Sequence, residues 1–389
     1  MPDAILALNA GSSSLKFALF ELGQRSARLR GAVSGIGTDD PLFEARADGV
    51  EVINERWDSA DGKPPVERLV TWIEAHLGPD RLIATGHRVV HGGTAFSDPV
   101  RIDPEIFAQL ERLTPLAPLH QPVSLRPIAA LSAFRPDMLQ VACFDTAFHH
   151  RLTPPASRYA IPRAMEQQGL RRFGFHGLSY ESIAASLAAR SDTARSERII
   201  VAHLGNGASL CAMQDLQSRD TSMGFTALDG VMMGTRPGSL DPGLILYLLR
   251  EQGFDADRLE QFLYHECGLL GVSGISADVR ELLASDAAPA REALEQFAYS
   301  VAGHVAALGT SIGGVDRLVF TGGIGEHAWQ VREAICARLG WLGTALNDVA
   351  NQRSGAIISA RSSRIRVEII PTDEEAVIAR HTAGLCLRE

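Results

Sequence analysis

The stretch from 220 to 243, DTSMGFTALDGVMMGTRPGSLDPG, concentrates more side chains capable of chemistry than any other part of the chain. Asp220, Asp229, Arg236 and Asp241 occur there among glycine and proline residues, with no helical or strand periodicity. Glycine and proline fix the path of the backbone, and an arginine in a rigid bend can bind a carboxylate or phosphate through two hydrogen bonds. The alternative is a structural Ω-loop whose arginine caps a nearby carbonyl, and this segment alone favours neither interpretation.

Three glycine-rich turns follow apolar, strand-like runs and are candidates for phosphate binding. They lie at 9–14 (NAGSSS), 205–209 (GNGAS) and 322–325 (GGIG). The sequence has no GxxxxGK[ST] motif and no GxGxxG motif that opens a βαβ unit, and it also has no HExxH or GxSxG motif. If a phosphate is bound, the backbone N–H groups of these turns must hold it.

Three further side chains are candidates, each with a structural alternative. Arg88 lies close to two histidines in GHRVVHGG, where it is either an anion ligand or a surface arginine at a strand end. Asp145 ends the apolar run 139–144, so it either caps the next turn or serves a metal or a proton transfer. His176, between glycines in RRFGFHGLSY, is either a structural donor or a catalyst.

The last candidates lie in PTDEEAV, at 371–377. Thr372 and Glu375 have the spacing of a capping box, which predicts a structural role for Glu375. Glu374 is not needed for that box and is available to a metal ion.

Composition excludes several classes of function. The 389 residues are 46% hydrophobic and 21% charged, as in a soluble globular protein, and the net charge of −9 argues against a nucleic-acid partner. Five scattered cysteines show no zinc-binding spacing and indicate reduced thiols. Neither a signal peptide nor a membrane-spanning run is recognisable, so we expect a cytoplasmic protein with no membrane association.

Apolar strands alternate with amphipathic helices, which predicts an α/β fold. The expected strands are 4–8, 15–22, 82–86, 139–144, 198–204, 210–213, 316–320 and 366–370, and the expected helices are 65–77, 104–113, 243–252, 256–266, 290–312, one ending near 338, and 372–383. The strand–turn–strand pattern at 4–22 returns at 198–213, which favours two similarly built halves. The stretch 23–65 gives no clear prediction.

Taken together, these segments resemble the acetokinase family, within the superfamily of sugar kinases, heat-shock-70 proteins and actin. The family's motifs occur in order along nearly the whole chain: LNAGSSSLKF, GHRVVHGG, LAPLH, FDTAFH, RRFGFHG, HLGNGAS, DTSMGF, MGTRPGSLDPG, GISADVREL, FTGGIGE and PTDEEAVIAR.

The resemblance implies an α/β fold of two duplicated ribonuclease-H-like (actin-like ATPase) domains flanking a central cleft. Residues 1–150 would form an acyl-substrate domain, completed by the C-terminal helix at about 376–389, and residues 151–375 a nucleotide-binding domain. The implied activity is reversible phosphoryl transfer from ATP to acetate in a homodimer. Mg²⁺ is the implied cofactor, with Mn²⁺ as a substitute, and ATP is the co-substrate.

The resemblance also assigns roles to residues. Arg88 and Arg236 would grip the carboxylate and the migrating phosphoryl group, His176 would stabilise the transition state, and Asp145 would act near the metal and acetate. The remaining assignments are to the metal (Asn9, Glu374), to the acyl pocket (Arg88, Val90, Leu119, Phe175, Ala227) and to the nucleotide (Lys16, His203, Gly205, Asn206, Gly207, Asp278, Val279, Arg280, Gly322, Gly323, Ile324, Gly325). Acetate is already ionised at pH 7, so we expect Asp145 to organise the metal or water rather than to accept a proton.

Departures from the family pattern keep rival functions open. Ala227 stands where many members have proline, and a wider acyl pocket would favour propionate or butyrate, although one methylene changes specificity by only about 1–3 kcal/mol. His327 replaces a frequent asparagine near the adenosine, which bears on the choice of base. A non-transferring, ATP-gated clamp is the rival from another class, since the superfamily contains both.

Overall fold

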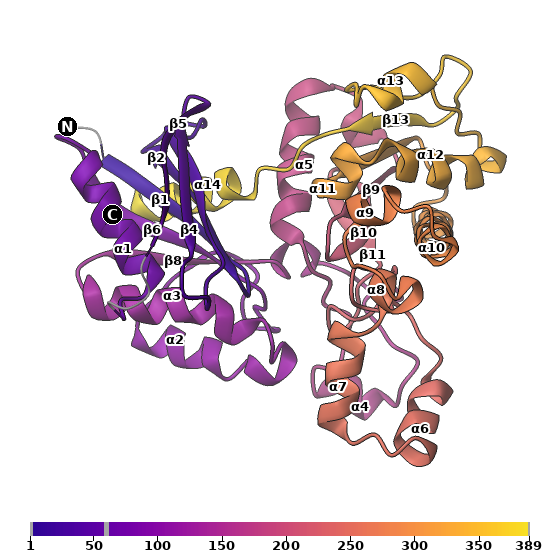
Figure 1. Cartoon of the computed structure of the whole chain (residues 1–389), viewed down its shortest axis with the longest axis horizontal. Coiled ribbons are helices and arrows are strands. Elements are labelled where there is room, and N and C mark those ends of the chain that lie inside the picture. The colour runs from indigo at the N-terminus through magenta and orange to yellow at the C-terminus, as the bar shows by residue number, and fades with distance from the viewer. Residues whose placement is uncertain (1–2, 58–61, 388–389) are drawn as a thin grey trace. The chain divides into compact units, whose positions relative to one another are not determined.

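The computed structural model describes residues 3–57 and 62–387, which form two compact units (Figure 1). Unit 1 comprises residues 1–148 together with 373–389, and unit 2 comprises residues 149–372. The chain therefore leaves unit 1, builds the whole of unit 2, and returns. In Figure 1 the yellow helix α14 accordingly lies among the indigo and violet elements of unit 1.

Unit 1 is built on an eight-stranded sheet in the order β5-β4-β3-β2-β1-β6-β8-β7. Strands β1 to β5 form an antiparallel meander, whereas β6 runs parallel to β1, and β8 parallel to β6. The elements of this unit are β1 (Asp3–Ala10), β2 (Ser14–Glu21), β3 (Leu29–Ser34), β4 (Leu42–Ala47), β5 (Val50–Arg56), α1 (Pro65–His76), β6 (Arg81–Val89), β7 (Val100–Arg101), α2 (Pro104–Glu111), α3 (Gln121–Phe134), β8 (Leu139–Phe144) and α14 (Glu374–Cys386).

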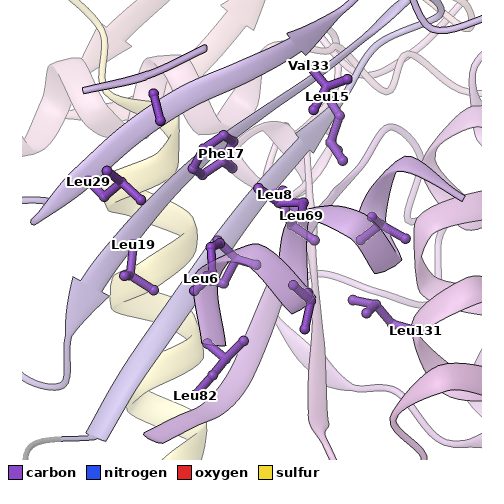
Figure 2. Close-up of a cluster of buried hydrophobic side chains, with 14 of the residues drawn as sticks. Leu6, Leu8, Leu15, Phe17, Leu19, Leu29, Val33, Leu69, Leu82 and Leu131 are labelled. Atoms are coloured by element: carbon purple, nitrogen blue, oxygen red, sulfur yellow. The ribbon is translucent and has the colours of Figure 1, made fainter. Parts of the chain in front are cut away.

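Both faces of this sheet are covered at its centre, which explains why the central strand β1 reads as a continuous apolar run. Successive side chains of a strand point to opposite faces. Leu6 and Leu8 pack with Leu69 of α1 and Leu131 of α3 on one face (Figure 2). On the other face α14 approaches so closely that a Cβ added to Gly86 would lie 2.2 Å from the Thr382 hydroxyl oxygen. α14 is thus a structural part of unit 1.

Unit 2 repeats this topology with a five-stranded sheet in the order β11-β10-β9-β12-β13. Its first three strands form an antiparallel meander, and β12 and β13 run parallel to β9, as β6 and β8 do to β1 in unit 1. The elements are α4 (Arg163–Gln167), α5 (Gly177–Arg190), β9 (Ile199–Leu204), β10 (Ala208–Gln214), β11 (Gln217–Thr221), α6 (Pro242–Glu251), α7 (Ala256–His265), α8 (Gly268–Ser273), α9 (Val279–Leu283), α10 (Ala288–Ser311), β12 (Arg317–Thr321), α11 (Gly322–His327), α12 (Trp329–Arg338), α13 (Asp348–Gln352) and β13 (Arg366–Ile369). The predicted α/β fold with two ribonuclease-H-like units is confirmed.

The regular elements expected from the sequence are present, and the structure adds others that were not expected, among them α3, α5 and β11. The stretch 23–65, which gave no clear prediction, contains β3, β4 and β5, while its residues 58–61 lie outside the described part. β5 is largely exposed and rich in charge, so it lacks the alternation that marks a half-buried strand. The turn expected at 322–325 is instead the first turn of α11. No helix among the described residues is long and apolar enough to cross a membrane.

Two buried histidines make the stability of the fold sensitive to acid. Burial lowers the pKa of His149 to about 4, against a raising effect of its hydrogen bond to the Phe175 carbonyl, and burial lowers the pKa of His87 to about 3. An unfolded histidine takes up a proton near pH 6.5, so the unfolded state gains stability as the pH falls below that value. Between pH 6.5 and pH 5, each of these two histidines should lower the free energy of unfolding by about 2 kcal/mol.

Urea unfolding at pH 7 and pH 5 measures this effect. The variant His149→Gln should show a pH dependence weaker by about 2 kcal/mol than that of the natural sequence. An unchanged pH dependence in this variant would show that His149 is protonated in the folded protein.

Candidate functional site

Arg88 and Asp145 meet because the two strands that carry them are parallel neighbours. Arg88 lies in β6 opposite Cys143 of β8, and Asp145 follows the end of β8. The Arg88 Nε and Nη2 atoms both donate to Oδ2 of Asp145, at 2.9 and 2.6 Å. Burial opposes the charge of Arg88, but Asp145 and Glu374 outweigh burial and raise its pKa. The guanidinium is therefore a permanent cation at the carboxyl edge of the sheet.

A second pair of acids reaches the same cluster from the C-terminal helix. Nδ2 of Asn9, in β1, donates to Glu374 Oε2 at 2.8 Å and to Glu375 Oε1 at 3.5 Å. Nη1 of Arg88 lies 3.4 Å from the Asn9 side-chain oxygen, which joins the two halves of the cluster. Burial raises the pKa of Glu374 to about 7; Arg88 counteracts this shift, while Asp145 and Glu375 add to it.

The capping box predicted from Thr372 and Glu375 is wrong. α14 begins at Glu374, and its N-cap is Asp373, whose carboxylate accepts from the Ala376 N–H. Asp373 satisfies the helix end, so Glu375 is not needed there. It contributes instead a further negative charge beside Asn9. The predicted availability of Glu374 to a metal is consistent with this geometry.

The residues of this cluster fit a hard divalent cation that keeps most of its coordination for other ligands. Oδ1 of Asp145 is buried and has no hydrogen-bond partner among the residues that the structure describes. Carboxylate and amide oxygens are the ligands that Mg²⁺ prefers, and Mg²⁺ is usually held by one or two carboxylates together with water and phosphate oxygens. Within residues 3–57 and 62–387, no group of three or more His, Cys, Asp or Glu side chains forms a complete protein cage for a metal.

In unit 2, two histidines lie at the hairpin turn between β9 and β10. The rings of His176 and His203 stack, with centroids 4.5 Å apart and planes at 24°. A Cβ added to Gly207 would lie 3.4 Å from His176 Nε2, and one added to Gly205 would lie 3.9 Å from His203 Nε2. His176 is the N-cap residue of α5 and has a left-handed backbone, with φ 57°. The turn therefore combines backbone N–H groups with two imidazoles.

Arg236 lies beside the same turn. Its Nη2 atom would be 3.7 Å from a Cβ added to Gly207, and its guanidinium carbon lies 5.8 Å from the centre of the Tyr264 ring. Nη1 donates to the Ala227 carbonyl at 3.1 Å. Nη1 thus caps a carbonyl, as the structural interpretation of Arg236 predicts, while Nη2 faces the 205–207 turn.

The acids of the 220–243 segment have structural partners. Asp229 pairs with Arg172 at 3.3 Å, and Asp241 caps α6 by accepting from the Gly243 N–H. Gly238 has φ 75° and packs on the Gly230 carbonyl, where a Cβ would lie at 2.4 Å. The segment is a loop folded on itself, which holds Arg236 in place.

A cavity of about 470 Å³ opens in unit 2 between the hairpin turn, α9 and α11. This volume is within the range of small-molecule sites. Predicted nucleotide residues that line it are Gly205, Asn206, Asp278, Val279, Arg280, Gly323 and Ile324. It is also lined by His327, which the family resemblance places near the adenosine, and by four residues that the sequence did not assign to the nucleotide: Ala277, Leu283, Ala328 and Gln330. Gly323 and His327 are four residues apart in α11, so they lie on one face of that helix. Gln330 lies beyond the break at Ala328, in α12, and no spacing rule in the sequence predicts its place at the cavity.

Comparison with known proteins shows which family this sequence matches. The model of the acetokinase family matches residues 4–380. The chain is 49% identical to an acetate kinase of Rhodopseudomonas palustris (strain TIE-1), over 98% of either chain. It is 41% identical to a propionate kinase of Citrobacter rodentium, over 100% of this chain and 98% of the other.

Two solved structures of acetate or propionate kinases are also similar to this chain over nearly its full length. A Francisella tularensis propionate kinase superposes with a TM-score of 0.89 at 35% identity, over 98% of this chain and 99% of the other. A Porphyromonas gingivalis acetate kinase superposes with a TM-score of 0.85 at 35% identity, over 99% and 100%.

The chain belongs to the acetokinase family.

The acetokinase motifs are distributed between the two units. Lys16 is paired with Asn9 across the β1–β2 hairpin, so it lies in unit 1 and does not line the unit 2 cavity. The acyl-pocket candidates Val90 and Leu119 lie in unit 1, the first buried and the second 37% exposed. Phe175 and Ala227 lie in unit 2, where Phe175 is buried.

Several acetokinase glycines have packing roles. Gly322 has φ 77°, and a Cβ there would lie 2.8 Å from the Leu204 carbonyl oxygen, so the start of α11 packs directly on the end of β9. Gly325 would place a Cβ 3.5 Å from the Phe320 backbone. Asp278 caps α9 and pairs with Arg280 at 2.6 Å, although both also line the cavity.

Proposed function

We propose that this chain is an acetate kinase, which transfers the γ-phosphoryl group of ATP to acetate and forms acetyl phosphate and ADP. The observation that carries the proposal is the cluster of Asn9, Arg88, Asp145 and Glu374. These residues are far apart in the sequence, they occupy the family's motif positions, and they form one hydrogen-bonded group in unit 1. Near full-length identity of up to 49% with acetate kinases supports it.

The proposed mechanism needs donors and charge rather than a nucleophile on the protein. Acetate is already an anion, and the migrating phosphoryl group is anionic as well, so cations must overcome their repulsion. We assign this role to Arg88 and Arg236, with Asp145 orienting Arg88 through its two hydrogen bonds. His176 would stabilise the transition state as a donor to phosphoryl oxygens.

The nucleotide is assigned to unit 2 and the acyl substrate to unit 1. The cavity of about 470 Å³ would hold the adenosine, and the 205–207 turn the phosphates. Asn9 and Glu374 would hold Mg²⁺, or Mn²⁺ in its place; when bound, the metal neutralises charge on the β- and γ-phosphates. We further propose a cytoplasmic homodimer, as the family resemblance implies.

Trapping the product tests the proposal. Incubation with Mg-ATP, acetate and hydroxylamine should give acetyl hydroxamate in proportion to the ADP formed. Omitting acetate should abolish both products. ADP formation that is indifferent to acetate would refute the kinase and support an ATP-gated clamp of the chaperone or actin kind.

Propionate is the second candidate substrate, because two of the relatives above are propionate kinases and Ala227 replaces a bulkier proline. Comparing kcat/KM for the C2, C3 and C4 acids decides between them. We expect acetate to give the highest value, and a higher value for propionate or butyrate would reassign the substrate.

The variant Glu374→Gln tests two separate roles of this side chain, in binding the metal and in the stability of the folded protein. The amide is a poorer ligand for Mg²⁺, so we expect activity at sub-saturating Mg²⁺ to fall about 10- to 100-fold and to recover partly at high Mg²⁺. The raised pKa of Glu374 means that ionising it in the folded protein costs stability as the pH rises from about 4.5 to about 7. At pH 8 without metal, the variant should therefore be more stable by up to about 3 kcal/mol. Activity and Mg²⁺ dependence that match the natural sequence would remove Glu374 from the metal site.

A further inference from the structure

The two stacked histidines of unit 2 share a second feature, which the proposed mechanism does not use. Nδ1 of His203 lies 2.8 Å from the Ser179 hydroxyl oxygen, and Nδ1 of His176 lies 2.8 Å from the Ser209 hydroxyl oxygen. Both serines are fully buried. Each ring thus has a serine on its Nδ1 side and the 205–207 turn on its Nε2 side.

For Ser179 the direction of the hydrogen bond follows from counting donors. The structure gives its hydroxyl no other hydrogen-bond partner among the described residues. A buried O–H group that donates to nothing is costly, so the proton must point at His203 Nδ1. Nδ1 then accepts, and the proton of a neutral His203 ring is on Nε2.

For Ser209 the direction follows from the buried phenol of Tyr180. The Tyr180 and Ser209 hydroxyl oxygens are 2.5 Å apart, and Tyr180 is fully buried. A phenol is a stronger proton donor than an aliphatic hydroxyl, so Tyr180 donates to Ser209. The Ser209 proton is then directed at His176 Nδ1, which again leaves the ring proton on Nε2.

We propose that Ser179 and Ser209 are positioning residues that hold His203 and His176 as neutral Nε2–H tautomers. Two cationic rings stacked at 4.5 Å would repel each other, whereas two neutral rings do not. Both Nε2–H groups then act as preorganised donors at the 205–207 turn. The chemical class of ligand that they fit is the anionic phosphoryl oxygen. This identification of the ligand rests on the proposed function.

Nitrogen NMR of ¹⁵N-histidine-labelled full-length protein tests the tautomers directly. His176 and His203 signals are assigned with the variants His176→Gln and His203→Gln. In the natural sequence both residues should show a protonated Nε2 and an unprotonated Nδ1. In Ser209→Ala and in Tyr180→Phe, the His176 signal should move towards tautomer exchange or protonation, while Ser179→Ala should do the same for His203.

Kinetics give a second readout with a matched control. Ser209→Ala should lower kcat about 10- to 100-fold, with the KM for ATP changed by less than about threefold, because the lost orientation matters most in the transition state. Ser218→Ala is the control: Ser218 is also buried, and its hydroxyl lies 2.8 Å from Nδ1 of the buried His149, which has no proposed role in the chemistry. We expect kcat of the control to stay within about twofold of the natural value.

A protonated Nδ1 on His176 or His203 in the natural sequence would overturn the proposal. It would also be overturned if Ser209→Ala left the His176 signal unchanged, or if the control lost as much activity as Ser209→Ala. The NMR result does not depend on turnover. Absence of acetate-dependent turnover would therefore refute the proposed function while leaving the tautomer assignment to be judged on the spectra.

Discussion

Arg88→Ala is expected to lower kcat for acetyl phosphate formation by at least about a hundredfold, since a well-placed arginine in related phosphoryl transfers contributes more than that. The Arg88 guanidinium donates two hydrogen bonds to Asp145. Its positive charge also interacts with the carboxylate of Glu374. Its removal takes away both the charge that attracts the anionic substrates and the group that compensates two carboxylates.

Stability must be measured in the same variant, because Asp145 is 1% exposed and loses its partner. Breaking a buried pair costs about 3–5 kcal/mol. Rescue by added guanidinium ion separates this cost from catalysis: millimolar guanidinium should restore part of the activity if the site is otherwise intact. Arg28→Ala removes a surface pair with Asp80 and serves as the control with unchanged kcat. Turnover of Arg88→Ala within about tenfold of the natural value would eliminate Arg88 from the chemistry.

Arg236→Ala should have an effect of the same size, a loss of at least about a hundredfold in kcat. Its Nη2 atom faces the Gly207 turn beside His176, where a charge on a phosphoryl group would be compensated. The competing structural interpretation gives Arg236 only the task of capping the Ala227 carbonyl. That interpretation predicts a lower unfolding temperature with normal turnover of the folded molecules.

Two comparisons distinguish these outcomes. Arg219→Ala removes an exposed pair with Asp215 in the same unit and should leave kcat unchanged. Arg236→Lys retains the charge but not the fork of donors, so it should recover only a small part of the lost activity. Full activity in Arg236→Lys would show that a point charge is enough and that two-point binding plays no role.

The fold was largely predictable because the strands at the centre of its two sheets are buried. β1 and β9 are continuous apolar runs, each followed by a glycine-containing turn and a second strand. That repeated pattern reflects a real duplication, since both units have the same strand order about these hairpins. β5, at the edge of its sheet, escaped prediction because its exposed charged positions erase the period-2 signal. β3 and β4 lie inside the sheet but each carries an exposed arginine, which weakens the same signal.

The site was predictable only as a set of motif positions. Arg88 and Asp145 are 57 residues apart, and no local rule brings them together; parallel pairing of β6 with β8 does. The capping box at Thr372 failed because a nearer acid, Asp373, satisfies the same helix end. The contact of Ser209 with His176 depends on where α5 meets β10, and neither the start of α5 nor the left-handed conformation of its N-cap residue was evident in the sequence.

The return of the chain to unit 1 has a consequence for synthesis. Ribosomes make β1 before α14, so Asn9 can contact Glu374 only after the whole of unit 2 has been translated. A product that terminates early can complete the meander of unit 1 but lacks the helix that covers Gly86 and supplies two acids. A chain that stops before α14 therefore lacks Glu374 and Glu375 and leaves the sheet uncovered at Gly86, so we expect it to be inactive.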